Sequence, residues 1–145
     1  MSPELIFEPV INMLWLSLAV FAFGTTLRLK SIIIDKKSKE EDFKIPTFDN
    51  GGEAIQNSQR NLTNLFEFPI FFYVVCTMIY VTGNVDGYFV LLATWFFWLR
   101  VAHTVTHIFY NKVIPGIAIP VRTLFWLPST IILGWMAYRA CSMMM

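Results

Sequence analysis

Four long apolar stretches constrain the fold of this 145-residue chain more than any other feature of its sequence. They lie near residues 10–27, 62–82, 88–108 and 117–138, and each approaches the roughly 20 residues with which a helix crosses a bilayer. Strands of a membrane barrel would be shorter and would alternate in polarity. The pattern therefore predicts one all-α membrane domain over residues 1–145, a four-helix bundle with up-down topology.

The composition supports a membrane protein. Hydrophobic residues make up 56% of the chain and charged residues only 14%, whereas soluble domains carry roughly 25% charged residues. The net charge of +1 provides no bulk field for binding nucleic acid. Cys76 and Cys141 lie in apolar surroundings without a CxxC or Cys/His spacing, so we expect neither a metal site nor a disulfide.

The distribution of basic residues predicts the orientation. Positive residues gather in cytoplasmic loops of membrane proteins. The loop near residues 30–59 and its flanks carry seven of the eleven basic residues: Arg28, Lys30, Lys36, Lys37, Lys39, Lys44 and Arg60. We therefore expect this loop on the cytoplasmic face and both termini on the opposite face. The brevity of the chain and its plain termini favour a bacterial inner membrane for this multi-pass protein. The mixed charges of the run KKSKEED indicate a solvated surface.

Two of the four stretches are too short to cross a bilayer without carrying polar residues. Residues 88–99 span only about 18 Å as a helix, so the crossing helix must also bury Arg100 and His103. The second stretch draws in Glu67 and Asn64 for the same reason. Ionisable groups at this depth cost at least about 2.5 kcal/mol each and usually face a partner helix or a wet cavity. They therefore mark a candidate functional site.

Helical spacing places these residues on one polar stripe per helix. The stripe on the second stretch contains Arg60, Asn64 and Glu67, and the stripe on the third contains Arg100, His103 and His107. We expect Glu67 and Arg100 to form an ion pair, because each satisfies the other better than lipid does. Such a pair could also serve only to fix the register of the bundle.

More polar residues gather near the cytoplasmic mouth than one ion pair requires. They are Arg60, Asn64, His103, His107, Asn111, Arg122 and Thr123. Taken singly, the arginines could be interfacial anchors and the histidines core hydrogen-bonding groups. Taken together, their excess positive charge predicts a site for an anionic ligand whose carboxylates are held by arginine forks.

Three segments resemble one known family. The sequences QRNLTNLFEFPIFF (59–72), RVAHTVTH (100–107) and PVRT (120–123) are similar to the membrane-associated proteins in eicosanoid and glutathione metabolism, the MAPEG family, which contains the microsomal glutathione transferases. RVAHTV most resembles the prostaglandin E synthase branch. The resemblance implies a homotrimer of four-helix subunits that binds glutathione between neighbouring subunits near the cytoplasmic face.

The resemblance also implies roles for individual residues. The positions that match glutathione-binding residues are Arg28, Arg60, Asn64, Glu67, Arg100 and His103, and His107 stands in place of a binding tyrosine. Arg122 matches the arginine that stabilises the glutathione thiolate, and Thr123 stands where the prostaglandin branch has a serine. Thr63 replaces an arginine of that branch, so the resemblance does not identify the substrate.

The implied activity is that of a glutathione-dependent membrane transferase or peroxidase, in which a thiolate adds to a lipophilic electrophile arriving from the bilayer. Two alternatives remain open from the sequence. The protein could bind glutathione as a scaffolding subunit without turnover. It could also be a small transporter in which Glu67, His103 and His107 form a proton or ion path.

Overall fold

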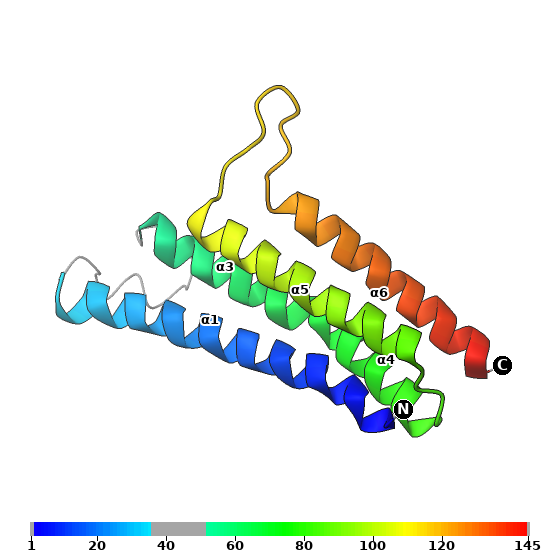
Figure 1. The fold of residues 1–145 in the computed structure, drawn as a ribbon. Coiled ribbons are helices and arrows are strands. Elements are labelled where there is room, and N and C mark those ends of the chain that lie inside the picture. Colours follow the sequence, from blue (N-terminus) through cyan, green and yellow to red (C-terminus); the bar gives the residue numbers. More distant parts are fainter. Residues whose placement is uncertain (1, 36–51, 145) are drawn as a thin grey trace.

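The computed structural model describes residues 2–35 and 52–144, and within these ranges the protein consists of helices that run side by side (Figure 1). A short 3-10 helix, Pro3–Ile6, leads into α1 (Phe7–Ile33). The next rod consists of α3 (Glu53–Glu67) and α4 (Pro69–Val81), followed by α5 (Gly87–Phe109) and α6 (Thr123–Met144). The predicted all-α fold with up-down topology is therefore confirmed. Most of the predicted loop near residues 30–59, including KKSKEED, lies outside the described residues.

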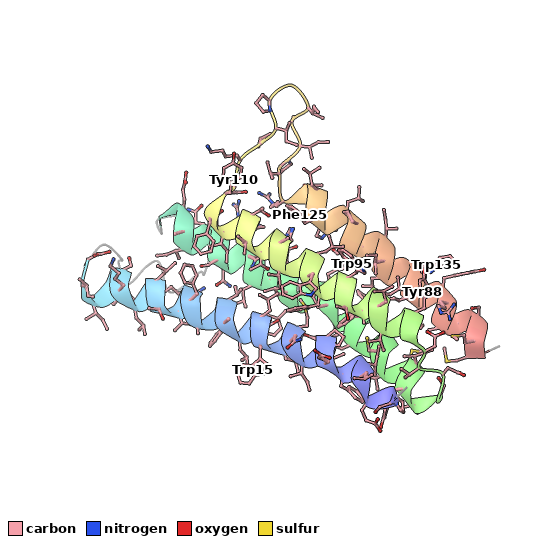
Figure 2. All side chains as sticks on the ribbon, viewed as in Figure 1. Trp15, Tyr88, Trp95, Tyr110, Phe125 and Trp135 are labelled. Atoms are coloured by element: carbon pink, nitrogen blue, oxygen red, sulfur yellow. The ribbon has the colours of Figure 1, made fainter. Side chains whose placement is uncertain are left out.

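Three of the helical rods are long and apolar enough to cross a membrane. They are Pro3–Ile33, Glu53–Val81 and Gly87–Phe109. α6 is 22 residues long but is not among them, so the predicted fourth crossing stays a prediction. On the outside of the bundle, large apolar side chains are exposed; Trp15, for example, is 66% exposed and points away from α1 (Figure 2). An outer surface of this kind suits lipid rather than water.

The second rod begins earlier than the apolar stretch near residues 62–82 predicted. Its first half, α3, is rich in amides and other polar side chains, whereas α4 is almost wholly apolar. The helix is interrupted at Phe68 because Pro69 has no N–H with which to continue the ladder. The rod therefore has a polar end and an apolar end, and the polar end lies beside the last turns of α5.

The prediction for the fourth stretch was wrong at its start. Residues 117–122 do not begin a helix but belong to a hairpin-shaped loop, and α6 starts at Thr123. The sequence Pro115-Gly116 forms the turn: Gly116 has a φ of +83°, and the N–H of Ile117 donates to the carbonyl of Ile114 at 3.4 Å. Proline followed by glycine favours a type II turn. This turn signal overrides the apolar character of the segment.

The apolar end of the bundle forms the densest part of the core. Phe72 of α4 stacks on Phe96 of α5, with ring centroids 4.4 Å apart and planes inclined by 15°. Both rings are fully buried, as are Met13 of α1 and Met136 of α6. This packing fixes the helices against one another and leaves the polar end to form the site.

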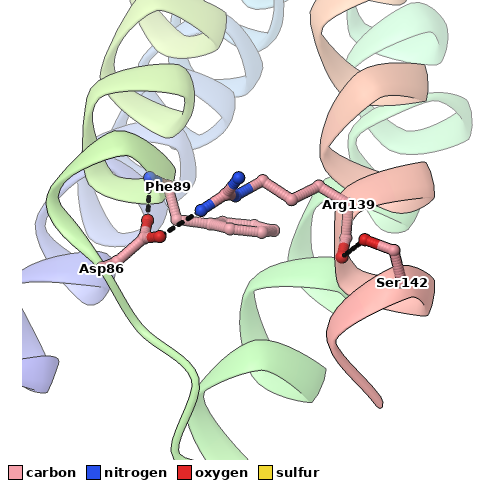
Figure 3. Close-up of polar contacts among 4 residues, drawn as sticks. All are labelled: Asp86, Phe89, Arg139 and Ser142. Carbon is pink, nitrogen blue, oxygen red and sulfur yellow. Dashed lines mark hydrogen bonds and ion pairs between the residues drawn. The ribbon is translucent and has the colours of Figure 1, made fainter. Parts of the chain in front are cut away.

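One carboxylate joins α5 and α6 at the end of the bundle remote from the hairpin. Asp86 caps α5 by accepting a hydrogen bond from the N–H of Phe89 at 2.7 Å, and its other oxygen forms an ion pair with Arg139 of α6 (Figure 3). The guanidinium of Arg139 also lies 5.1 Å from the ring centroid of Tyr88. Asp86 therefore holds the start of α5 and the last turns of α6 together.

We expect Asp86→Ala to lower the unfolding free energy by about 1 kcal/mol for the lost cap. The ion pair should add no more than about 1 kcal/mol, because both side chains are partly exposed. Arg139→Gln removes the ion pair and the contact with the Tyr88 ring but keeps the cap, and it should cost less. Thermal unfolding of the three proteins in detergent, followed by helical circular dichroism, checks the order. A larger loss in Arg139→Gln than in Asp86→Ala would contradict the capping role.

Candidate functional site

A cleft of about 410 Å³ opens at the polar end of the bundle, between α3, α5 and the start of α6. Its volume lies in the range of roughly 300–1,000 Å³ that is usual for small-molecule sites. The residues that line it are Arg60, Thr63, Asn64, His103, His107, Arg122, Thr123 and Trp126. Six of the nine predicted site residues are in this set. Residues of α3, α5 and the start of α6 therefore meet in one cleft, although Glu67 and Arg100 of the two predicted polar stripes do not line it.

The cleft has an excess of positive charge. Arg60 and Arg122 contribute two guanidiniums, which remain protonated in proteins. Within the part of the chain that the structure describes, no aspartate or glutamate lines the cleft. Its neutral polar groups are two hydroxyls, one amide and two imidazoles, all able to accept or donate hydrogen bonds. The arrangement is complementary to a small anion that also carries hydrogen-bonding groups.

Arg122 is held at both its main chain and its side chain. The Nδ1 atom of His103 lies 3.0 Å from the carbonyl oxygen of Arg122, and since a carbonyl only accepts, Nδ1 carries the proton. The guanidinium of Arg122 donates to Oδ1 of Asn111, whose Nδ2 donates to Oδ1 of Asn57 at 3.1 Å. The arginine is thereby connected through Asn111 to α3, on the opposite wall of the bundle.

Among residues 2–35 and 52–144, no hydrogen-bond partner is present for one ring nitrogen of each histidine of α5. These atoms, Nε2 of His103 and Nδ1 of His107, are buried, although both residues line the cleft. Buried polar groups normally have partners, and an unpartnered one calls for an explanation such as a water or a ligand. The two nitrogens therefore lack a partner that a water or a ligand entering beside the cleft could supply.

The predicted ion pair between Glu67 and Arg100 was wrong. Among the described residues, Arg100 forms no salt bridge; its Nη2 donates to the main-chain carbonyl of Asn64 at 3.1 Å, and the side chain is fully buried. Glu67 is exposed on the outer side of α3 and does not line the cleft. Helical spacing placed Arg100 on a buried side of α5, but it wrongly grouped Glu67 with Arg60 and Asn64, which line the cleft.

The interruption of the second rod explains the partner that Arg100 uses. Close to Pro69 the helical hydrogen bonds are weak, and the N–H of Phe68 reaches the Asn64 carbonyl only at 3.4 Å. That carbonyl can accept a second hydrogen bond, and Arg100 supplies it. Arg100 thus secures the end of α3 behind the cleft. Its contact with a ligand, which the family resemblance implied, stays a prediction.

Arg28 also lies outside the cleft. It is on α1 and hydrogen-bonds to Gln59 of α3. The resemblance implied that it reaches a site in a neighbouring subunit, and that role stays a prediction. Of the nine predicted site residues, Arg28, Glu67 and Arg100 are therefore the three that do not line the cleft.

Sequence reasoning missed a buried layer of polar side chains behind the cleft. Asn61 of α3 donates to the hydroxyl of Thr104 on α5 at 3.3 Å, and its own Oδ1 is buried without a partner. Asn57, one turn earlier, binds Asn111. The signal was present, because Asn57, Asn61 and Asn64 follow the i, i+4, i+7 spacing of one helix face.

Comparison with known proteins gives one match. The model of the MAPEG family matches residues 9–142, which is nearly the whole chain. Neither a curated protein nor a solved structure matches the chain. The matched range includes every residue that lines the cleft.

Proposed function

Because the chain belongs to the MAPEG family, which includes glutathione transferases and related members, we propose that it is a glutathione-dependent membrane transferase or peroxidase acting on a lipophilic electrophile. The observation that carries this proposal is the cleft, in which two arginines are present without an acidic residue. We further propose that the protein is a homotrimer in a bacterial inner membrane, with the cleft near the cytoplasmic face.

The chemistry of the cleft fits glutathione. The tripeptide carries two carboxylates, one ammonium, two amides and a thiol. Arg60 binds a carboxylate in the bidentate geometry that guanidinium favours. Asn64 and the unpartnered nitrogens of His103 and His107 bind the amide groups. Glu67 is three residues beyond Asn64 on the exposed edge of α3, and it binds the ammonium where a neighbouring subunit covers that edge.

Arg122 is the residue that activates the thiol. A free thiol has a pKa near 8.5, so only a few per cent is ionised at pH 7. Lowering that pKa by two units takes about 2.7 kcal/mol of preferential stabilisation of the thiolate. A guanidinium in a partly dry cleft can supply this amount, and the adjacent Thr123 donates a further hydrogen bond to the sulfur. The sulfur then bonds to the electrophilic carbon, and the leaving group departs with its electron pair.

An aromatic wall beside the cleft suits the second substrate. Trp126 lines the cleft, and its ring lies 5.9 Å from that of Phe68 at the junction of α3 and α4. An apolar molecule dissolved in the bilayer reaches this wall between helices without passing through water. Its electrophilic carbon is then placed next to the polar part of the cleft that holds the thiol.

Conjugation of 1-chloro-2,4-dinitrobenzene with glutathione by the detergent-purified protein tests the proposal, and reduction of cumene hydroperoxide tests the peroxidase form. We expect a protein-dependent rate in at least one assay. Glutathione binding without turnover would instead support a scaffolding subunit. The absence of both glutathione binding and turnover would overturn the proposal.

The transporter alternative has less support from the geometry. Glu67 does not line the cleft with the two histidines, so the three residues do not form an ion path there.

The link from Arg122 through Asn111 to Asn57 leads to a separate prediction. Asn111→Ala should raise the thiol pKa of bound glutathione by up to about one unit, because a hydrogen bond worth about 0.5–1.5 kcal/mol no longer orients the guanidinium. Thiolate absorbance measured against pH checks the shift, and the affinity for S-methylglutathione should stay unchanged. If Arg122, Asn111 and Asn57 act as a unit, the double variant Asn57→Ala/Asn111→Ala shifts the thiol pKa no further than Asn111→Ala alone. Additive shifts would contradict the link.

A further inference from the structure

The hairpin between α5 and α6 contributes Arg122 to the cleft and Asn111 as its hydrogen-bond partner, but its other residues have no role in the proposed reaction. It comprises residues 110–122, leaves the bundle at the end of α5, extends to one side of it and returns to the start of α6 (Figure 1). Its two arms are joined by main-chain hydrogen bonds from Ile114 to Ile119 and from Val121 to Lys112, both 2.9 Å. Pro115 and Gly116 close the turn. The hairpin therefore satisfies part of its own main-chain hydrogen bonding.

The side chains of the hairpin are unusually apolar for an exposed loop. Between residues 113 and 121 there is no charged residue. The large exposed side chains are Val113, Ile117 and Ile119, and Ile117 is 62% exposed. Loops facing water normally carry polar side chains, and a cluster of exposed apolar groups usually marks a surface that is covered. The apolar tip therefore needs an apolar environment.

The base of the hairpin has a different character from its tip. Lys112 lies over the ring of Tyr110, with Nζ 5.0 Å from the ring centroid, and Phe109 at the end of α5 is 70% exposed. Aromatic and basic side chains are enriched at the level of lipid headgroups. Figure 2 places Tyr110 at this base, where α5 ends. The base thus has the composition of a membrane-water interface.

The position of the hairpin identifies what covers it. α5 is one of the three rods able to cross a membrane, and it ends at Phe109, so the hairpin starts where the crossing ends. From there it runs sideways rather than onward along the helix axis (Figure 1). A segment that leaves a membrane-crossing helix sideways lies along the bilayer surface. The surface at that level is lipid, which is the environment that the apolar tip requires.

From these observations we propose that residues 110–122 form an interfacial anchor, whose apolar tip inserts into the boundary between headgroups and acyl chains on the side of the cleft. A short loop can enter this boundary when its main-chain groups are paired internally, because unpaired groups are costly away from water. Lys112 remains at the headgroups, where it can approach lipid phosphates. The proposal concerns lipid contact alone and does not depend on catalysis.

Spin labels on single cysteines test the anchor in the full-length protein. Cys141 is exposed and Cys76 is fully buried, so Cys141→Ser provides a background without an accessible thiol. Val113→Cys, Ile117→Cys and Ile119→Cys are each labelled with a nitroxide in phosphatidylcholine nanodiscs. Glu53→Cys is the matched control, because Glu53 is exposed at the same end of the bundle and lines a common cleft with Lys112.

If the proposal is right, the hairpin labels collide more often with oxygen, which dissolves in lipid, than with a water-soluble nickel chelate. The Glu53 label should show the opposite preference. Nickel accessibility at the hairpin equal to that at Glu53 would place the tip in water and overturn the proposal. Protection from both reagents together with dipolar broadening would place the tip against a second copy of the chain, which would also overturn it. Three label sites and a circular dichroism check guard against a misfolded variant.

Discussion

Replacing Arg122 with alanine should raise the thiol pKa of bound glutathione by about two units, from near 6.5 back to near 8.5. At pH 7 the thiolate absorbance of the complex then falls about 25-fold, because the ionised fraction drops from about three quarters to a few per cent. The conjugation rate should fall between about 3-fold and about 25-fold. The smaller limit applies because a more basic thiolate is intrinsically more nucleophilic.

Two comparisons make the Arg122 result specific. Arg122→Lys keeps a positive charge but loses the fork geometry that Asn111 orients, so its thiol pKa should lie between those of the parent and Arg122→Ala. The affinity for S-methylglutathione, which has no ionisable thiol, should be nearly the same in all three proteins. An unchanged thiolate absorbance in Arg122→Ala would remove this residue from the proposed mechanism.

Arg60→Ala should weaken the binding of glutathione and of S-methylglutathione equally, by about tenfold. Hydrogen bonds to charged groups contribute about 1.5–3 kcal/mol, and the lower value applies because Arg60 is exposed at the mouth of the cleft. The effect should shrink as salt is added, since exposed charges are screened. Isothermal titration calorimetry at low and at high ionic strength measures both trends.

The control for this variant is Lys30→Ala. Lys30 is exposed near the end of α1 and does not line the cleft, so its replacement removes one positive charge without removing a proposed ligand contact. We expect its affinities to match the parent protein. A tenfold loss in Lys30→Ala as well would show that overall charge, rather than Arg60, controls binding. A loss for glutathione but not for S-methylglutathione in Arg60→Ala would contradict the assignment of Arg60 to a carboxylate.

Much of this architecture follows from the sequence because burial in lipid imposes a simple rule. Long apolar stretches must form helices, and this fixed the order of the rods. Arg60, Asn64, His103 and His107 could be placed at one cleft because polar groups within such helices turn away from lipid. Their spacing showed which side of each helix they occupy. Hydropathy missed the polar first half of the second rod, since packing against neighbouring helices rather than apolar character keeps α3 helical.

The remaining errors arose where local backbone chemistry competes with side-chain pattern. The partner of Arg100 is the Asn64 carbonyl, which depends on the interruption at Pro69, and helical spacing carries no information about that. The apolar character of residues 117–122 predicts the start of a helix there, although Pro115-Gly116 immediately before them specifies a turn. Asn57 and Asn61 were overlooked because uncharged amides stand out less than arginine or glutamate in an apolar sequence.

The central claim is that the cleft binds glutathione with a preference for its thiolate. The most direct test is the affinity for glutathione divided by that for S-methylglutathione, measured from pH 6 to pH 9. Groups common to both ligands cancel in this ratio. If the cleft lowers the pKa of the glutathione thiol by two units, this affinity ratio rises with pH between the pKa of the bound thiol and that of the free thiol. The total rise is up to about 100-fold. A ratio that stays constant with pH, or no binding of either ligand, would contradict the account.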